Sequence, residues 1–302
     1  MIGTAVMAEL GTAILVDSTY SSDDPNDDEY EILEEISRGS FGVVYKARNE
    51  KTGEIVAMKE EVGGLCPSTL MEISILKTLP RHPCIIGFKQ AAGGERTYLV
   101  MEHMMSDLKR WRRTRNKPYA LFEIKYIMEQ ILKGVAFLHD NGVMHRDLKP
   151  SNILFGHKSD VKICDFGHSA RFPAPHGHAY SRVGTLWYMA PEILHGARDY
   201  TCAVDMWSVG ATMAEFLLDR VLFRGKSECH QMQCIKWAIN NQLVSFLQKQ
   251  LAEAAEPPKL AVAALTPVGF DLLQRLLTYQ KEDRITAKDA LNHAWFAEPS
   301  LY

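Results

Sequence analysis

The chain has 302 residues, 46% of them apolar and 24% charged, and its formal net charge is −3. This is the composition of an ordinary globular protein whose core is large enough to need no disulfide bonds. It gives no indication of nucleic-acid binding, and no uncharged apolar run reaches the roughly 18 residues of a membrane span. The six cysteines lack metal-ligand spacing, so we expect free thiols in an intracellular compartment, nuclear or cytoplasmic.

The first third of the chain is expected to form a small β-rich lobe behind a disordered arm. The arm, residues 1–29, ends in the polar and acidic stretch DSTYSSDDPNDDE, which cannot bury apolar surface. Three alternating runs rich in β-branched residues follow Tyr30 and predict strands, with a hairpin turn over 49–53. A helix is predicted from Ser68 to Leu79, because apolar residues recur there at helical spacing.

The rest of the chain is expected to form a larger helical lobe beyond a hinge near residues 102–107. A long amphipathic helix over 122–142 is predicted to end at Asn141 and Gly142, which favour a helix stop. Further helices are predicted over 204–218, 227–239, 268–279 and 286–296. The predicted fold class is therefore α+β with two lobes, an N-lobe over 30–103 and a C-lobe over 104–302.

Residues 36–47, ISRGSFGVVYKA, are predicted to form a glycine-rich turn between two strands. Glycine has no Cβ, so its backbone amide can approach a phosphate closely. Only Gly39 and Gly42 are present, because Ser37 stands where such turns usually carry their first glycine. Alone, the segment is more often a plain hairpin with two turn glycines.

Lys59 ends the apolar run VAMK, where a charge is unusual unless it is paired. Glu72, on the next predicted helix, is the obvious partner. Two solvated surface charges are the alternative interpretation.

The segment HRDLKPSNILF, residues 145–155, carries the most specific chemistry. Asp147 can accept the proton of a hydroxyl group, Lys149 can steady a transferring phosphoryl group, and Asn152 can hold magnesium. Asp165, in CDFG, is the second candidate magnesium ligand. Phosphoryl transfer needs such residues, because its transition state is dispersed negative charge that a metal ion and a lysine neutralise.

Two further pairings are predicted to be structural. Arg284 is placed to pair with Glu192 as a buried ion pair, and Asp205 is placed to hold the backbone of the 145–155 loop.

From Tyr30 to about Phe296 the chain resembles a eukaryotic protein kinase domain, on these motifs and on GTLWYMAPE (184–192). The segments CPSTLMEISILKTL, YLVMEHMMSDLKRW and DYTCAVDMWSVG are similar to cyclin-dependent kinases, and most similar to the PITSLRE-type subgroup. The resemblance implies ATP and Mg²⁺ as cofactors, and protein serine or threonine as substrate. It also implies a cyclin-like activating subunit on the helix from Ser68 to Leu79.

The resemblance implies a complete set of site residues. Catalytic roles fall to Asp147, Lys149, Lys59 and Glu72, and the magnesium ligands are Asn152 and Asp165. Met101 is the gatekeeper, and the backbone of Glu102 and Met104 binds adenine. The other implied nucleotide contacts are Ile36, Ser37, Arg38, Gly39, Ser40, Phe41, Gly42, Val43, Val44, Ala57, Lys59 and Leu154.

The chain departs from that family at its regulatory positions. Met71 replaces one of three arginines that grip an activating phosphate; Arg146 remains, and Arg171 is displaced by one residue. Tyr180 stands at the phosphorylated threonine, which leaves Ser181, Tyr180 or no residue as the site of activation. Gly184 and Met189 replace the valine and arginine of the proline-selecting pocket, so proline after the acceptor is not implied.

Two alternatives therefore stay open beside the cyclin-dependent type. One is a weakly active pseudokinase that binds nucleotide or scaffolds partners, and the other is a serine/threonine kinase that is neither cyclin-dependent nor proline-directed.

Cys164 is interpreted as a core residue rather than as part of the wall of the nucleotide pocket. The basic run RWRRTRNK, 110–117, is interpreted as a solvated face, with a patch for acidic substrates or partners as the alternative.

Overall fold

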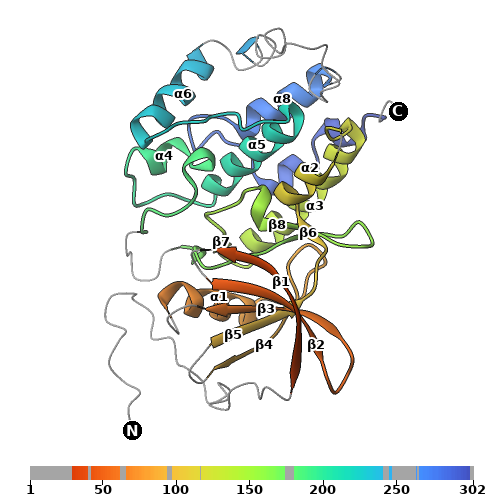
Figure 1. Ribbon diagram of the computed structural model, residues 1–302. Coiled ribbons are helices and arrows are strands. Elements are labelled where there is room, and N and C mark those ends of the chain that lie inside the picture. The colour runs from red at the N-terminus through yellow and green to blue at the C-terminus, as the bar shows by residue number, and fades with distance from the viewer. Residues whose placement is uncertain are drawn as a thin grey trace.

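The computed structural model describes residues 29–39, 42–61, 66–93, 97–115, 117–173, 180–240, 245–246, 263 and 265–299. These residues form a β-rich lobe and a helical lobe, stacked one on the other in Figure 1. The predicted two-lobed α+β fold is thus confirmed. Nearly all of the expected arm, together with Ser40 and Phe41, lies outside the described residues. None of the described helices combines the length and the apolar character needed to cross a membrane.

The small lobe is built on one antiparallel five-stranded sheet, in the order β1-β2-β3-β5-β4. Its strands are β1 (Tyr30–Gly39), β2 (Gly42–Asn49), β3 (Ile55–Glu61), β4 (Phe88–Gly93) and β5 (Thr97–Glu102). The predicted turn between β2 and β3 is confirmed: the Asn49 side chain accepts hydrogen bonds from the backbone N–H groups of Lys51 and Thr52.

The one helix of this lobe in the described residues, α1 (Pro67–Thr78), packs against the sheet. It begins one residue earlier than predicted, because proline fits the first helical turn, where its missing N–H is not needed. Ile73, Ile75 and Leu76 are buried on its inner side, and Glu72 is buried with them. The helix therefore carries a carboxylate into the protein interior.

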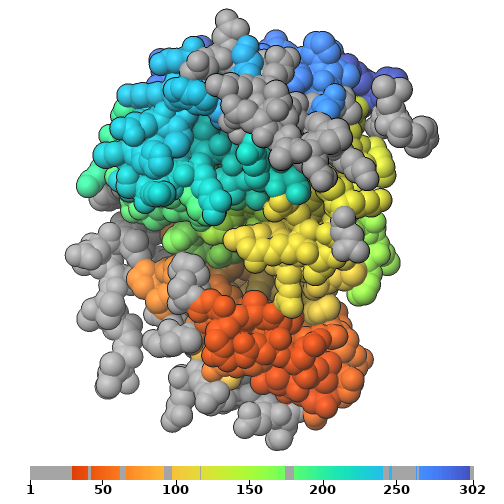
Figure 2. Space-filling model, turned by 45° about the horizontal axis from the view of Figure 1, so that its top comes forward, coloured from red at the N-terminus to blue at the C-terminus, as the bar shows by residue number. Residues whose placement is uncertain are grey.

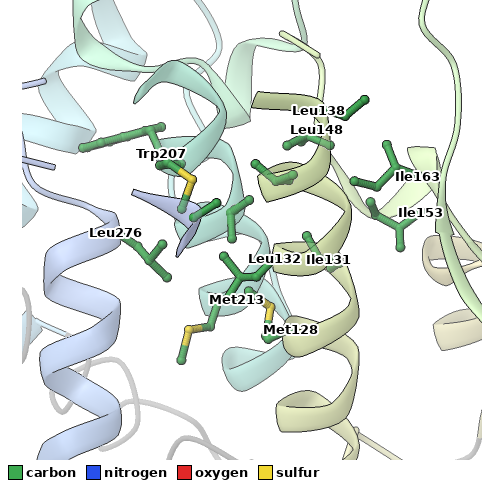
Figure 3. Close-up of a cluster of buried hydrophobic side chains, with 14 of the residues drawn as sticks. Met128, Ile131, Leu132, Leu138, Leu148, Ile153, Ile163, Trp207, Met213 and Leu276 are labelled. Atoms are coloured by element: carbon green, nitrogen blue, oxygen red, sulfur yellow. The ribbon is translucent and has the colours of Figure 1, made fainter. Parts of the chain in front are cut away.

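The helical lobe is organised around α5 (Ala203–Leu218), which is buried along its length from Val204 to Leu218. Figure 3 shows its Trp207 and Met213 packed between α3 (Leu121–Asp140) and α8 (Pro267–Leu276). The remaining helices are α2 (Leu108–Thr114), α4 (Pro191–Leu194), α6 (Glu228–Asn240), α9 (Ala287–Leu291) and α10 (Ala294–Ala297).

The predicted helix over 286–296 is wrong as a single element, because the chain breaks it into α9 and α10. The His293 ring accepts a hydrogen bond from Trp295 N–H and so caps a new helix start. The helix predicted over 122–142 is confirmed as α3, which ends where Gly142 takes a positive φ of 66°.

Short elements between the lobes position the loops that carry the motifs. They are β6 (Ser106–Asp107), β7 (Val143–Met144), η1 (Pro150–Asn152), β8 (Ile153–Phe155), β9 (Val161–Ile163), β10 (Ala170–Arg171) and η3 (Leu186–Tyr188). Backbone hydrogen bonds connect the two lobes: the Ile163 N–H donates to the Cys84 carbonyl, and the Ile86 N–H donates to the Ile163 carbonyl.

The loop over 145–152 is held from within the helical lobe by Asp205 of α5, as predicted. Its carboxylate accepts the backbone N–H groups of His145 at 2.9 Å and Arg146 at 2.8 Å, and its Oδ2 lies 3.0 Å from His139 Nε2. Burial lowers the pKa of His139, but hydrogen bonds to Asp205 and Cys202 outweigh burial and raise that pKa to about 9. His139 and Asp205 therefore form a buried ion pair behind the loop.

The predicted pairing of Arg284 with Glu192 is also confirmed. Two guanidinium nitrogens lie 2.7 and 3.0 Å from the two carboxylate oxygens, and the Arg284 side chain is fully buried. The same guanidinium donates to Ala203 O and Thr278 O, and so ties α4 to the start of α5.

Arg284→Ala is expected to lower the free energy of unfolding by about 3–5 kcal/mol, because it leaves Glu192 without its partner inside the protein. Urea denaturation measures this loss. The control is Arg275→Ala, which breaks an exposed ion pair with Asp271 and should cost less than about 1 kcal/mol. Equal losses for the two variants would contradict the structural role of Arg284.

Stability should also depend on the protonation of His139. A histidine whose pKa is about 6.5 when unfolded and about 9 when folded stabilises the protein fully below about pH 6.5. That contribution, up to about 3 kcal/mol, is lost as the pH rises through 9. We expect His139→Asn to remove this alkaline loss in unfolding curves between pH 6 and about 10. The exposed His157→Asn should leave it unchanged, and an identical pH dependence for the His139 variant would refute the assignment.

Candidate active site

Lys59, on β3, and Glu72, on α1, form an ion pair between the sheet and the helix, with 2.7 Å between Lys59 Nζ and Glu72 Oε2. The other carboxylate oxygen of Glu72 accepts the backbone N–H of Phe166 at 3.2 Å. Both charged side chains are largely buried, so the interpretation as two solvated surface charges is wrong. One carboxylate thus connects β3, α1 and the CDFG segment of the other lobe.

The electrostatics of this pair keep Lys59 charged. Burial lowers the pKa of Lys59, but Glu72, Asp165 and Glu61 outweigh it and raise that pKa above its ordinary value. Complete burial raises the pKa of Glu72, and Lys59 and Phe166 N–H oppose this rise. Glu61 lies 2.9 Å from Lys59 Nζ, so the cation has a second acidic neighbour.

Asp147 is buried at the centre of a second polar cluster. Its Oδ1 accepts the backbone N–H of Thr185 at 2.8 Å and the Thr185 hydroxyl at 2.7 Å. Its Oδ2 lies 2.6 Å from Lys149 Nζ and accepts the amide of Asn152 at 3.2 Å. These contacts fix the carboxylate in one orientation, with its basic oxygens beside a lysine.

Unusual backbone conformations aim the loops that carry these residues. Arg146 and Asp165 have positive φ angles of 68° and 66°, which cost energy for residues with a Cβ. Arg146 is held there by Asp205, and His145 Nε2 lies 2.9 Å from Cys164 O, next to Asp165. The two motif loops are therefore linked to each other as well as to α5.

A cavity of about 310 Å³ lies between the lobes and opens onto both clusters. Its volume falls within the range of small-molecule sites. It brings together eleven of the residues predicted to bind nucleotide. They are Ile36, Ser37, Gly39, Gly42, Val44, Ala57, Lys59, Met101, Glu102, Met104 and Leu154. Glu72, Asn152 and Asp165 also line this cavity.

Arg38 and Val43 do not line the cavity, although they belong to the predicted nucleotide set. Arg38 pairs with Val43 across β1 and β2, one step from the pair Ser37–Val44, which does line it. Alternate residues of a strand point to opposite faces, so Arg38 and Val43 lie on the other face of the sheet. There, Arg38 forms an exposed ion pair with Glu35.

Some lining residues were missed from sequence. Ile86, Ser106, Asp107, Arg110 and Ser151 complete the cavity wall. Most of them belong to the hinge or to the HRDLKPSN segment, and both segments can be recognised from the sequence. The sequence does not indicate, however, which side chains of these segments point into the cavity. Cys164 lines the cavity as well as packing against the core, so the interpretation as a core residue alone is incomplete.

Gly42 is needed for the close approach of β2 to β3. Its φ is 140°, and a Cβ at this position would lie 1.9 Å from the carbonyl oxygen of Glu60. Glycine at position 42 is therefore required by the packing of β2 against β3, because no other residue fits there without moving the neighbouring strand.

The donor set fits a magnesium ion that is shared with phosphate. Asn152 and Asp165 supply amide and carboxylate oxygens, which are hard ligands of the kind Mg²⁺ prefers. The Asn152 amide nitrogen makes both of its hydrogen bonds to Asp147, which leaves the amide oxygen available. Among the described residues, no group of three or more His, Cys, Asp or Glu side chains could hold a metal. Two protein ligands suffice where phosphate oxygens and water complete the shell.

Of the three side chains considered at the regulatory positions, that of Arg146 contacts the segment around Tyr180 and Ser181, whereas Arg171 meets it through its backbone carbonyl, which accepts the Tyr180 hydroxyl at 3.2 Å. Its guanidinium donates to His168 O at 2.6 Å and to the Tyr200 hydroxyl at 2.8 Å. The Tyr200 hydroxyl donates to Ser181 O at 2.6 Å, and the rings of Tyr200 and Tyr180 are 5.1 Å apart. The Arg146 guanidinium and the neutral groups that it contacts thus dock this segment against the loop over 145–152.

The side chains at the other two positions point elsewhere. Arg171 donates to the hydroxyl of Thr78 on α1, and Met71 packs against the hydrophobic core. The structure therefore does not assemble three arginines around residues 180–181, in keeping with the departures seen in the sequence.

Comparison with known proteins places the chain in a family. The model of the protein kinase domain matches residues 30–296. Cyclin-dependent kinase G-1 of Oryza sativa subsp. indica is 43% identical over 91% of this chain and 43% of that protein. Cyclin-dependent kinase G1 of Arabidopsis thaliana is 40% identical, over 90% of this chain and 50% of that protein. Cyclin-dependent kinase 11B of Homo sapiens is 38% identical, over 91% of this chain and 37% of that protein.

This chain spans half or less of the length of these three relatives. The family match nevertheless covers both lobes and every motif of the site. The resemblance predicted from the sequence is confirmed: this chain belongs to the protein kinase domain family and is similar to the cyclin-dependent kinases of the G and 11 types.

Proposed function

We propose that this chain is an intracellular serine/threonine protein kinase of the cyclin-dependent type, which transfers the terminal phosphate of ATP to protein hydroxyls. The observation that carries this proposal is the convergence of two clusters on one cavity. Lys59 and Glu72 lie at one side, and Asn152 and Asp165 lie at the other. Asp147 is joined to them through Asn152.

Each residue has a defined part in the reaction. Asp147 orients the substrate hydroxyl and accepts its proton, as the hydroxyl oxygen bonds to the terminal phosphorus and the bond from that phosphorus to the leaving ADP breaks. Lys149, 2.6 Å from Asp147, offsets the charge of the transferring group, and Lys59 binds the phosphates of the nucleotide. Magnesium, held by Asn152 and Asp165 when bound, neutralises phosphate charge.

Lys149 also supports serine or threonine as the acceptor. HRDLKPSN is the form of this motif found in serine/threonine kinases. Tyrosine kinases usually have a different residue at the position of this lysine. In the structure Lys149 donates to both Asp147 and the Thr185 hydroxyl. These contacts hold Lys149 beside the carboxylate that accepts the proton of the serine or threonine hydroxyl.

We infer that a cyclin-like subunit docks on α1, the helix that carries Glu72. The relatives are named cyclin-dependent kinases, and α1 presents Leu70, which is only partly buried and does not belong to the core formed by the described residues. A partner that binds this side stabilises the position of Glu72 beside Lys59 and shifts the population toward the active form.

Gly184 and Met189 favour a kinase that does not select proline. Gly184 has φ 114°, and a Cβ there would lie 2.6 Å from Arg146 O and 3.8 Å from the Met189 side chain. A glycine beside a methionine thus stands in place of the valine and arginine that shape the proline-selecting pocket. Substrates with alanine or proline after the acceptor should therefore be phosphorylated at similar rates.

Asp147→Asn is expected to lower the rate of phosphate transfer at least 100-fold, because the amide cannot accept the hydroxyl proton. Transfer from radiolabelled ATP to mixed serine and threonine peptides, with Mg²⁺ present, measures this. The matched control is the exposed Asp160→Asn, which should keep the wild-type rate. Equal transfer after Asp147→Asn, or none from wild type even with added cyclins, would favour a nucleotide-binding scaffold.

A cyclin that binds α1 should raise the transfer rate at least tenfold, and Leu70→Glu should abolish that rise by placing a charge in an apolar contact. The control is Phe122→Glu, a similar substitution at an exposed residue of α3, and this variant should keep the increase in rate. Binding is followed by co-purification with a panel of cyclins. Full activity of the chain alone, with no cyclin bound, would show that the regulation is not of this type.

A further inference from the structure

An open groove of about 890 Å³ crosses the helical lobe, distinct from the cavity between the lobes. Its walls come from α2, from the end of α5 with the loop 219–224 that follows it, and from α6. In Figure 2 the yellow surface that includes α2 and the cyan surface of α6 lie on either side of a teal surface, while α5 itself is buried. Elements far apart in sequence thus build one concave surface.

Cations dominate the exposed charge of this groove. Lys109, Arg113 and Arg224 line it and are exposed, and no ion pair involves them within the described ranges of the chain. Arg112 and Arg220 line it as well. Three unpaired cations in a concavity attract anions more strongly than the same charges on a flat surface.

Within the described part of the chain, the two carboxylates that line the groove are already engaged. Asp219 pairs with Arg112, and the Arg112 guanidinium also donates to the Asp219 carbonyl. Glu215 is buried and accepts the Tyr188 hydroxyl at 2.5 Å, and burial raises the pKa of its carboxyl group. Among the described lining residues, the negative charge is therefore partnered or buried, and the accessible charge is positive.

The groove also contains exposed aromatic surface. Trp237 on α6 is 47% exposed, and the guanidinium of Arg224 lies 5.6 Å from the ring centre of Trp187. The Trp187 indole N–H donates to the carbonyl oxygen of Gly225, and this hydrogen bond fixes the orientation of the ring. A bound peptide could thus bury apolar parts of its side chains while its carboxylates meet the cations.

Trp187 connects the groove to the catalytic carboxylate. It belongs to η3 and lies two residues from Thr185, whose N–H and hydroxyl both contact Asp147. A protein chain that places a hydroxyl at Asp147 passes this short segment and reaches the groove within a few residues, since an extended chain advances about 3.3 Å per residue.

We propose that this groove binds an acidic segment of the protein substrate that flanks the phosphorylated serine or threonine. The proposal rests on the proposed kinase function and adds to it the class of substrate. It also revises the interpretation of the basic run 110–117, because Arg112 and Arg113 border a groove, whereas Arg110 donates to Ile36 O beside the nucleotide cavity.

The test compares three peptides that share one serine and differ only in their flanks, which carry glutamate, glutamine or lysine at two to six residues on either side. We expect kcat/KM for the glutamate peptide to exceed that for the glutamine peptide by about five- to tenfold at low salt. The ratio should fall toward one at about 0.5 M salt, where exposed charges are screened. Anisotropy of a labelled glutamate peptide with alanine at the acceptor measures binding without any transfer.

The double variant Arg113→Glu/Arg224→Glu should abolish the preference for glutamate. Lys236→Glu is the matched control, since Lys236 is exposed on α6 but does not line the groove, and it should preserve the preference. Circular dichroism and melting temperature establish that each variant folds. If the double variant does not fold, the comparison of the three peptides with the wild-type protein still tests the proposal.

The outcomes separate this proposal from the kinase function itself. Equal transfer to all three peptides, or a preference for lysine set by Glu215, would overturn the acidic groove while supporting kinase activity. Saturable binding of the glutamate peptide that the double variant loses, without transfer to any peptide, would support the groove and count against catalysis. Loss of the preference in Lys236→Glu as well would show a general charge effect and overturn the proposal.

Discussion

The buried ion pair of Lys59 and Glu72 is the interaction on which the rest of the site depends. Lys59 is fixed to the sheet, Glu72 is fixed to α1, and the second oxygen of Glu72 holds the backbone of Phe166 next to Asp165. A shift of α1 therefore disturbs the phosphate-binding lysine and the metal-binding aspartate together. Because a buried charge without its partner is costly, the pair favours two discrete arrangements of α1, formed or broken, over a continuum. That property makes α1 suitable as a switch that a partner protein can operate.

The helical lobe supplies the rigid half of the site. α5 is buried along almost its whole length, and Asp205, at its first turn, holds the loop in which Arg146 adopts a strained conformation. Asp147 then receives its orientation from Thr185, Lys149 and Asn152. The segment around Tyr180 and Ser181 docks on the same loop through Arg146 and the hydroxyl of Tyr200. The packing of the large lobe thus sets the orientation of Asp147. The Lys59–Glu72 ion pair of the small lobe then supplies the remaining part of the site.

Much of this site could be predicted from the sequence, because its residues occur in short ordered motifs whose chemistry is specific. Lys59, Glu72, Asp147, Asn152 and Asp165 meet as expected, and so do Arg284 with Glu192 and Asp205 with its loop. Other features depend on contacts that single segments do not reveal. Strand register turns Arg38 and Val43 away from the cavity, and capping by His293 divides a helix that periodicity predicts as continuous. The Arg146–Tyr200 contact and the basic groove join residues from distant segments, so only the folded structure brings them together.

The most direct test of the central claim is the rate of phosphate transfer by Glu72→Gln, measured with a serine peptide at saturating ATP and Mg²⁺. The substitution keeps the size of the side chain and removes its charge, and Glu61 remains beside Lys59, so the protein should stay folded. The account predicts that kcat/KM falls at least about 100-fold while the melting temperature changes by only a few degrees. A folded Glu72→Gln variant that transfers phosphate within about twofold of the wild-type rate would contradict it.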